Sequence, residues 1–218
     1  MSDNNPYFQH HFVDSHQQHE SAKLGMWAFL VTEVLTFAGL FCAYAIFRAW
    51  YPDMFISAHK ALDVYMGAIN TVVLITSSLT MALAIRNLQM NNSRAAIINL
   101  SLTLFFAGMF LFIKYFEYEH KIHCGHLPGM YYHPHIAPDC IAISGTNPHV
   151  FFSIYFMMTG LHGIHVVIGM GLILWLIIRT MRGHFSPAYY TPVEMVGLFW
   201  HLVDLVWIFL FPLLYLIG

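Results

Sequence analysis

Five long apolar segments constrain this chain more than any other feature of its sequence. A helix needs about 20 apolar residues to cross the hydrocarbon core, because every backbone polar group must be satisfied within it. None of the segments alternates apolar and polar residues with period two, which argues against a membrane β-barrel. We therefore predict an all-α, polytopic membrane protein with five transmembrane helices. The predicted spans are about Leu24–Phe47, Ala61–Ile85, Ala95–Tyr115, Val150–Ile178 and Val193–Ile217.

The composition supports a membrane protein and argues against a nucleic-acid partner. Only 9% of the residues are charged, whereas a soluble domain carries about 25%. The formal net charge is −2 with histidine neutral, so nothing in the charge balance favours a polyanion. The first 22 residues have no basic region followed by an apolar core, so they do not resemble a secretory signal. We predict a polar tail over 1–22 and a transmembrane domain over 23–218.

The distribution of basic residues predicts which end of the bundle faces the cytoplasm. Five crossings place the two termini on opposite faces of the membrane. Positive charge is enriched on the cytoplasmic side, and the count here, five against four, favours a cytoplasmic N-terminus and a periplasmic C-terminus. On this topology the loop over 119–147 lies in the periplasm. The face of the N-terminus carries Lys23, Arg86, Arg94, Arg179 and Arg182, and the other carries Arg48, Lys60, Lys114 and Lys121.

Ionisable residues inside a span are costly, so each is a candidate functional residue. Glu33 lies about 14 Å into the first span, and His201 lies about 12 Å into the fifth. Because both depths are counted from the same face, a contact between Glu33 and His201 is geometrically allowed. Asp204 follows His201 by three residues and shares its helical face. Two interpretations remain open: a proton-handling pair, or an interhelical hydrogen bond that fixes the bundle.

Two further histidines share a face of the fourth span. His162 and His165 are three residues apart, and we favour packing and hydrogen bonding for both. A haem held by two histidines needs imidazoles at equal depth on facing helices. Neither His162 nor His165 matches the depth of His201, so the sequence argues against haem ligation.

The loop between the third and fourth spans is rich in histidine and cysteine. Periplasmic cysteines form stable disulfides, and Cys124 and Cys140 are candidates for a bridge worth about 3 kcal/mol. A second interpretation is an unbridged loop that docks another subunit or an electron-donor complex. The third is a zinc or copper site from His123, Cys124 and His126, although this spacing fits no zinc-finger pattern, and we expect no metal ligands in this chain.

Five motifs, in order along the chain, resemble one known family. The motifs are "KLGMWAFLVTEVLTFAGLF" (23–41), "INTVVLITSSLTMALA" (69–84), "YFEYEH" (115–120), "FMMTGLHGIHVVIG" (156–169) and "FWHLVDLVWIFLFPLLYL" (199–216). Together they resemble subunit III of the haem-copper terminal oxidases, in its bacterial five-helix form.

The resemblance implies an accessory, metal-free subunit of a respiratory oxygen reductase of the cytochrome c oxidase type, located in the bacterial inner membrane. Haem and copper are then expected in a partner, the catalytic subunit I, whose proton uptake and lifetime this subunit supports. The helices are expected in two groups around a cleft that holds phospholipid. Glu33 falls on the carbodiimide-reactive carboxylate of the family, Glu117 on its Glu-Tyr segment, and His201 and Asp204 on its Trp-His-x-Val-Asp motif.

Two departures leave other functions open. The seven-helix mitochondrial form has two further N-terminal helices that these five spans do not include, and the loop over 119–147 has no counterpart in the family pattern. A subunit III-like partner of a quinol oxidase or a nitric oxide reductase is an alternative. A hypothesis of a different class is a stand-alone proton-coupled transporter that uses Glu33, His201 and Asp204 as a relay.

Overall fold

The computed structural model describes residues 12–128, 131, 132, 140, 143, 147–187 and 189–217. Throughout this part of the chain the secondary structure is helical, apart from two isolated bridges in the loops. Among the described residues, five helices are long and apolar enough to cross a membrane, which confirms the predicted all-α polytopic class. The elements are α1 (Ser15–Trp50), α2 (Pro52–Ala58), the 3-10 helix η1 (His59–Ala61), α3 (Val64–Gln89), α4 (Ser93–His123), α5 (His149–Met181) and α6 (Thr191–Tyr215).

Side-chain caps determine where three of these helices begin. Asp14 accepts a hydrogen bond from the backbone N–H of Gln17 at 2.6 Å, and Asp63 and Asn92 cap α3 and α4 in the same way. A cap satisfies one of the backbone donors that a helix start leaves unpaired. As a result, α1 begins at Ser15, inside the stretch predicted to be a polar tail, and extends well before the apolar segment.

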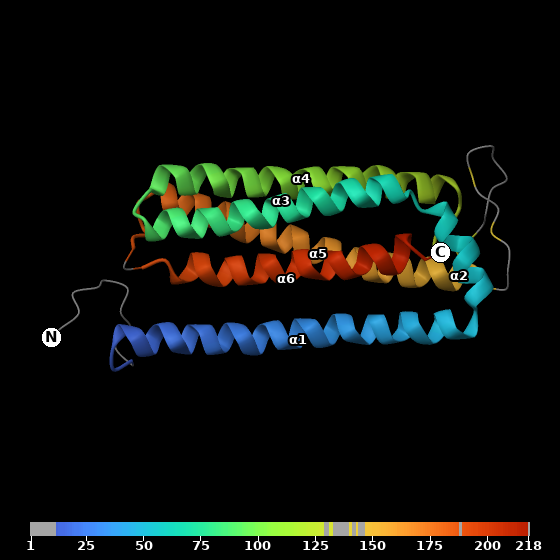
Figure 1. The fold of residues 1–218 in the computed structure, drawn as a ribbon, viewed down its shortest axis with the longest axis horizontal. Coiled ribbons are helices and arrows are strands. Elements are labelled where there is room, and N and C mark those ends of the chain that lie inside the picture. The colour runs from blue at the N-terminus through green and yellow to red at the C-terminus, as the bar shows by residue number, and fades with distance from the viewer. Residues whose placement is uncertain are drawn as a thin grey trace.

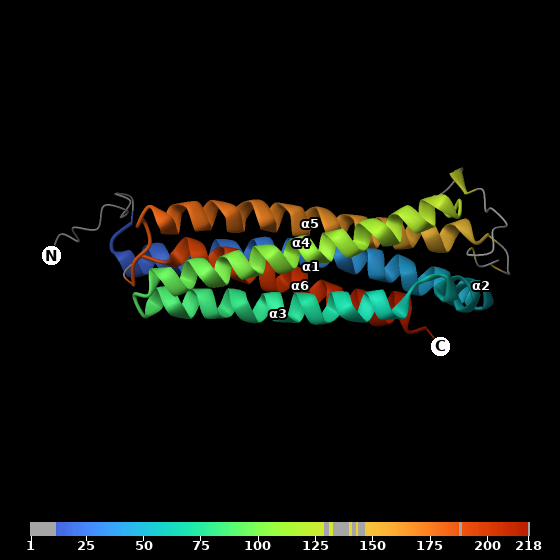
Figure 2. The same ribbon diagram turned by 90° about the horizontal axis from the view of Figure 1, so that it is seen from above.

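The long helices form a four-helix bundle with a fifth helix beside it. In the bundle, α3 packs against α4 and α6, and α5 packs against α4 and α6. Figure 1 shows α1 along the side of α5 and α6, joined to α3 by the short α2 and η1 at one end. In the second view α1 again runs parallel to the bundle axis (Figure 2). The predicted two-group arrangement is therefore one helix against four.

Two glycines allow large aromatic side chains to pack deeply in the bundle. A Cβ on Gly169 would lie 2.7 Å from Cε3 of the Trp200 ring, and one on Gly67 would lie 2.8 Å from Cε2 of Phe211. Such distances are too short for a methyl group, so close helix approach here requires glycine. Trp200 is fully buried in this position, and its Nε1 donates to Ser77 Oγ on α3 at 3.0 Å.

Polar contacts attach α1 to the bundle at three levels. Near the start of α1, Nδ1 of His19 lies 3.1 Å from Oγ1 of Thr191. Near its end, the Tyr44 hydroxyl donates to the carbonyl oxygen of Leu213. Between these two levels Glu33 contacts His165. The helix therefore has a fixed position against α5 and α6, although many of its apolar side chains remain exposed.

Candidate functional site

An apolar groove of about 330 Å³ lies between α1, α5 and α6. Its walls include Met26 and Phe29 from α1, Leu172 from α5 and Phe199 from α6. Among the side chains that line it, Glu33 and His165 are the ionisable ones. Because a charged group in an apolar membrane environment is costly, these two residues are the part of the groove most capable of chemistry.

Glu33 and His165 contact each other directly across the groove. The distance from Glu33 Oε2 to His165 Nε2 is 2.7 Å. The other ring nitrogen of His165, Nδ1, lies 2.8 Å from the carbonyl oxygen of Leu161. The side chain of Glu33 is 19% exposed and that of His165 is 12% exposed. The pair is thus largely enclosed, and both nitrogens of the imidazole have a defined partner.

The contact between Glu33 and His201 that the sequence allows does not form, because Glu33 pairs with His165 instead. His201 lies on a different side of α6, where its Nδ1 is 2.6 Å from Ser78 Oγ of α3. Measured from the helix ends, Glu33 lies about 27 Å from the start of α1, His165 about 24 Å from the end of α5 and His201 about 15 Å from the start of α6. The sequence estimate counted depth from Leu24, and the earlier start of α1 moves Glu33 to the level of His165.

Asp204 and His162 lie in the interior of the four-helix bundle rather than in the groove. Asp204 is 3% exposed, and the Ser78 hydroxyl lies beside its carboxyl group. His162 is fully buried, and its ring packs against Phe110 and Trp207, with centroids 5.4 and 5.3 Å away. Its two ring nitrogens have no hydrogen-bond partner among the described residues. His162 therefore makes the expected packing contacts, whereas His165 makes the expected hydrogen bonds.

A second polar cluster joins α4, α5 and α6. Lys114 Nζ lies 2.9 Å from Glu117 Oε2 and donates to the Tyr215 hydroxyl at 2.6 Å. The hydroxyls of Tyr155 and Tyr215 donate to Glu117 Oε1 at 2.8 and 2.5 Å. The ammonium group also lies 4.7 Å from the ring centre of Trp207. Every polar group of this cluster has a partner, as a buried ion pair requires.

Sequence reasoning found Glu117 but missed its partners. The sequence assigns Lys114 to the membrane face opposite the N-terminus, because the apolar segment ends near Tyr115. The helix continues to His123, so Lys114 and Glu117 lie in the interior of the bundle. The spacing of three residues between them indicates a shared helix face and could have predicted the pair. Nothing in the sequence indicated that Tyr155 and Tyr215 complete it.

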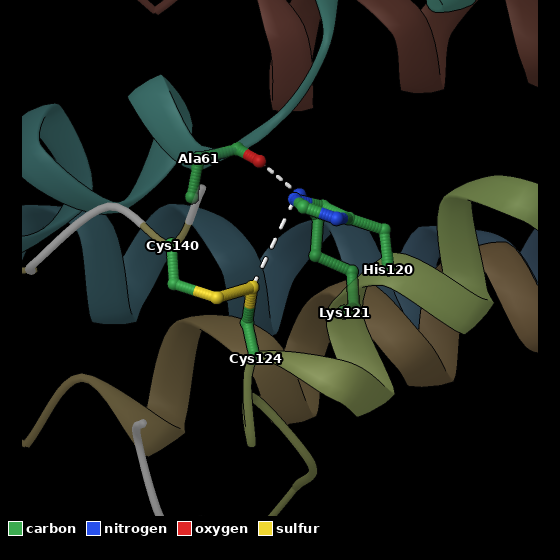
Figure 3. Close-up of a disulfide and its surroundings, with 5 residues drawn as sticks. All are labelled: Ala61, His120, Lys121, Cys124 and Cys140. Atoms are coloured by element: carbon green, nitrogen blue, oxygen red, sulfur yellow. Dashed lines mark hydrogen bonds between the residues drawn. A yellow bond between two sulfur atoms is a disulfide. The ribbon is translucent and has the colours of Figure 1, made fainter. Parts of the chain in front are cut away.

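The end of α4 carries a disulfide. Cys124 and Cys140 are joined by an S–S bond, beside which Lys121 Nζ donates to the carbonyl oxygen of Ala61 (Figure 3). Nε2 of His120 lies 3.8 Å from the Cys124 sulfur. The bridge therefore fixes the loop to the end of α4, and α4 in turn holds the connection between α1 and α3.

The hypothesis of a metal site at His123, Cys124 and His126 is wrong in this structure. A cysteine in a disulfide has no thiolate to offer a metal. His126 is buried, and its ring stacks on Phe152 with centroids 4.5 Å apart. Burial, with smaller effects from Lys121 and His120, lowers the pKa of His126 to about 4. The two remaining histidines of the loop, His133 and His135, lie outside the described residues.

Comparison with known proteins identifies the family of this fold and site. The family model for cytochrome c oxidase subunit III matches residues 7–125 and 137–218. Cytochrome c oxidase subunit 3 of Thermostichus vulcanus is 31% identical over 208 residues, which cover 93% of this chain and 90% of the relative. Cytochrome bo(3) ubiquinol oxidase subunit 3 of Pseudomonas putida is 28% identical over 204 residues, 93% of this chain and 89% of the relative.

A third relative is a longer protein. The haem-copper oxidase subunit I+III of Aeropyrum pernix is 29% identical over 209 residues, which cover 91% of this chain but 23% of that relative. The matches of the family model and of the two subunit 3 relatives extend over most of the chain, through all five long helices. The chain belongs to the subunit III family of the haem-copper oxidases.

Proposed function

We propose that this chain is the non-catalytic subunit III of a respiratory oxygen reductase of the cytochrome c oxidase type, and that it supports proton uptake by the catalytic subunit. The single observation that carries the proton-handling role is the contact of 2.7 Å between Glu33 and His165 in the groove between three of the long apolar helices. A carboxyl group at this depth is costly to keep, and a partner imidazole stabilises it there. Family membership supports the oxidase assignment.

The proposed partner is catalytic subunit I, together with other oxidase subunits. The name of the Aeropyrum pernix relative joins subunits I and III in one protein, which supports direct association of the two. In the described residues no three His, Cys, Asp or Glu side chains gather as metal ligands. In this proposal haem and copper are assigned to the partner catalytic subunit, as membership of the subunit III family supports.

The orientation in the membrane follows from charge and from the disulfide. The end of the bundle where α1 begins carries Lys23, Arg86 and Arg94, and the opposite end carries the Cys124–Cys140 bridge. Positive charge is favoured on the cytoplasmic side, and disulfides persist in the periplasm. Both support a cytoplasmic N-terminus, a periplasmic loop over 119–147 and a location in a bacterial inner membrane. That loop is also the proposed contact for an electron donor.

Phospholipid is the proposed occupant of the groove beside α1. Its walls are apolar apart from Glu33 and His165, and acyl chains are the apolar molecules available at this depth. The proposed electron donor is cytochrome c. Subunit 3 relatives from cytochrome c oxidases and from quinol oxidases match at overlapping identities, 28–32% and 28–29%, so the choice between the two donors depends on the oxygen-reduction test below.

Co-purification tests the oxidase assignment. A tagged chain, solubilised in mild detergent from its own membranes, is expected to carry haem absorbance and a catalytic subunit in one particle. Reduction of oxygen with reduced cytochrome c, but not with quinol, is expected from that particle. A haem-free particle that contains this chain alone would contradict the proposal. That is the result which the transporter hypothesis predicts.

The role of Glu33 is tested by the Glu33→Gln variant within the complex. A hydrophobic carbodiimide is expected to label this chain in the wild type and to label it much less in Glu33→Gln, with slower proton uptake at an unchanged subunit composition. Glu20→Gln is the matched control, because Glu20 lies on the same helix, outside the groove, with 55% of its side chain exposed. Unchanged labelling and proton uptake in Glu33→Gln would exclude Glu33 as the proton-handling carboxylate.

A further inference from the structure

The outer face of α3 and α6 carries a histidine with one unused hydrogen-bonding position. His201 is partly exposed, and its Nδ1 lies 2.6 Å from Ser78 Oγ of α3. Its Nε2 has no hydrogen-bond partner among the described residues and is not enclosed by the bundle. Because Nε2 is either a donor or an acceptor in every tautomer of imidazole, His201 can bond a group outside this chain.

This nitrogen lies near the middle of the membrane-spanning part of α6. The helix has 25 residues, which gives a length of about 38 Å, and His201 lies about 15 Å from its start. Acyl chains at this depth offer no hydrogen bond, and a polar group without a partner in hydrocarbon costs free energy. Lipid alone therefore does not satisfy Nε2 of His201.

Outward-facing threonines of the same helices satisfy their polar groups internally. The hydroxyl groups of three of them each donate to a backbone carbonyl oxygen three or four residues earlier: Thr32, Thr36 and Thr76. A threonine of this kind can face lipid at little cost. The imidazole of His201 is held by Ser78 through Nδ1, and Nε2, on the other side of the ring, points away from that contact.

The face that carries His201 is separate from the groove beside α1. Phe199, which lines that groove, lies two positions before His201, and two positions on an α-helix correspond to about 200° of rotation. Leu205 and Ile208 share the face of His201 instead, because they follow it at spacings of four and then three residues. Both are exposed, so an apolar surface continues along α6 beyond the imidazole.

On its inner side, Ser78 connects His201 to the interior of the bundle. The Ser78 hydroxyl also lies beside the carboxyl group of Asp204, which is 3% exposed. A serine hydroxyl donates one hydrogen bond and accepts others, so Ser78 can bond both side chains at once. Asp204, Ser78 and His201 thus form a polar chain that holds the ring against α3 and leaves Nε2 on the outer face.

We propose that this face docks a transmembrane helix of the catalytic subunit, and that the helix offers a hydrogen-bond donor or acceptor to Nε2 of His201. The inference rests on the proposed function, since it takes its partner from there. A transmembrane helix has the two properties that this surface requires: apolar side chains against Leu205 and Ile208, and a polar group at the depth of His201. Interhelical hydrogen bonds of this kind join membrane helices.

Photo-crosslinking in the intact oxidase complex tests the docking surface. A benzophenone amino acid replaces Leu205 or Ile208, and the same replacement at Phe105 of α4 is the control. Phe105 is 63% exposed, lies about 18 Å from the start of α4, and belongs to the helix diagonally across the bundle from α6. Illumination is expected to join this chain to the catalytic subunit in higher yield from Leu205 or Ile208 than from Phe105. Equal yields, or cross-links only to lipid, to a second copy of this chain or to another subunit, would overturn the proposal.

Two substitutions of His201 separate the outward hydrogen bond from the inward one. The amide of asparagine can replace Nδ1 of histidine, whereas the longer glutamine reaches the position of Nε2. His201→Asn is expected to keep the contact with Ser78 but to bind the catalytic subunit about threefold to tenfold less tightly, the effect of one interhelical hydrogen bond. His201→Gln is expected to bind nearly as the wild type does. Detergent titration of the complex measures the association, and the opposite order, or equal association of all three proteins, would contradict the outward bond.

The possible outcomes separate the inference from the proposed function. A haem-containing complex whose catalytic subunit is not cross-linked from Leu205 or Ile208 would leave the oxidase assignment standing and contradict the docking surface. Normal proton uptake in Glu33→Gln, together with the expected cross-links, would contradict the proton-handling role and leave the docking surface standing. A particle without a catalytic subunit would contradict both.

Discussion

Lys114 and Glu117 form an ion pair inside the bundle, with Lys114 Nζ 2.9 Å from Glu117 Oε2 and both side chains less than 10% exposed. They lie one turn apart on α4, and the hydroxyls of Tyr155 and Tyr215 satisfy the remaining carboxylate positions. A buried pair of this kind contributes little by itself, but removal of one partner leaves an uncompensated charge.

The first prediction concerns the loss of one partner of this ion pair. Lys114→Met is expected to destabilise the folded chain by about 3–5 kcal/mol, because Glu117 would remain buried without its cation. The double variant Lys114→Met/Glu117→Leu is expected to recover most of that loss. Thermal unfolding of the purified complex measures both. Lys23→Met, at a partly exposed site, is the control, and equal melting temperatures of the single and double variants would contradict the prediction.

The second prediction concerns the close approach of α5 and α6 at Gly169. A methyl group there would meet the Trp200 ring at 2.7 Å, so Gly169→Ala is expected to cost about 1–3 kcal/mol through displaced packing. Gly171→Ala is the matched control, since its Cβ would have no atom within 4 Å. Unfolding curves of the two variants should differ clearly. A Gly169→Ala protein as stable as Gly171→Ala would show that the contact is not tight.

The third prediction concerns the thiols. The chain has three cysteines, of which Cys42 is free and exposed and the other two form the bridge. Denatured protein is expected to react with a thiol reagent once per chain before reduction and three times after it. Loss of the bridge in Cys140→Ser is expected to lower stability by about 3 kcal/mol in the chain-entropy estimate. Three reactive thiols without reductant would exclude the bridge.

The fourth prediction concerns pH. Burial lowers the pKa of His126 to about 4, whereas the unfolded chain takes up this proton near pH 6.5. The unfolded state therefore binds more protons between these values, so stability is fully present above about pH 6.5 and is lost as pH falls toward 4. We expect a loss of about 1–2 kcal/mol, less than the full shift implies, because solvent near the loop screens part of it.

The control for this pH effect is His126→Phe, which keeps an aromatic ring against Phe152 but does not titrate. Its melting temperature is expected to fall less than that of the wild type over the same acid range. Identical pH profiles for the two proteins would mean that another group causes the acid sensitivity.

Much of the fold could be predicted from the sequence, and the failures have physical causes. Five apolar segments specify five crossings because the bilayer demands internal hydrogen bonding over about 20 residues. The helix ends were harder to predict: Asp14 caps α1 among polar residues, where hydropathy gives no signal. That extension shifted the depth of Glu33 and led to the wrong partner, His201, in place of His165.

Rotation of a helix about its axis is the second quantity that the sequence does not specify. A transmembrane helix can be apolar on every side, so a stripe of hydrophobic residues does not show which side faces its neighbours. His201 faces Ser78, and Lys114 faces Tyr215, because the packing of the helices sets the rotation of each one. The Cys124–Cys140 bridge was one of three hypotheses, because spacing alone does not choose among them.

The attachment of α1 has a consequence for how a subunit can hold a carboxyl group steady in a fluid environment. His19, Glu33 and Tyr44 contact the bundle at three levels along one helix. Contacts at different heights fix both the depth of α1 and its rotation about its own axis, and Phe29 and Phe37 add packing between these levels. If the groove beside α1 holds phospholipid, as proposed, acyl chains can exchange there while these contacts keep the Glu33 carboxyl in place.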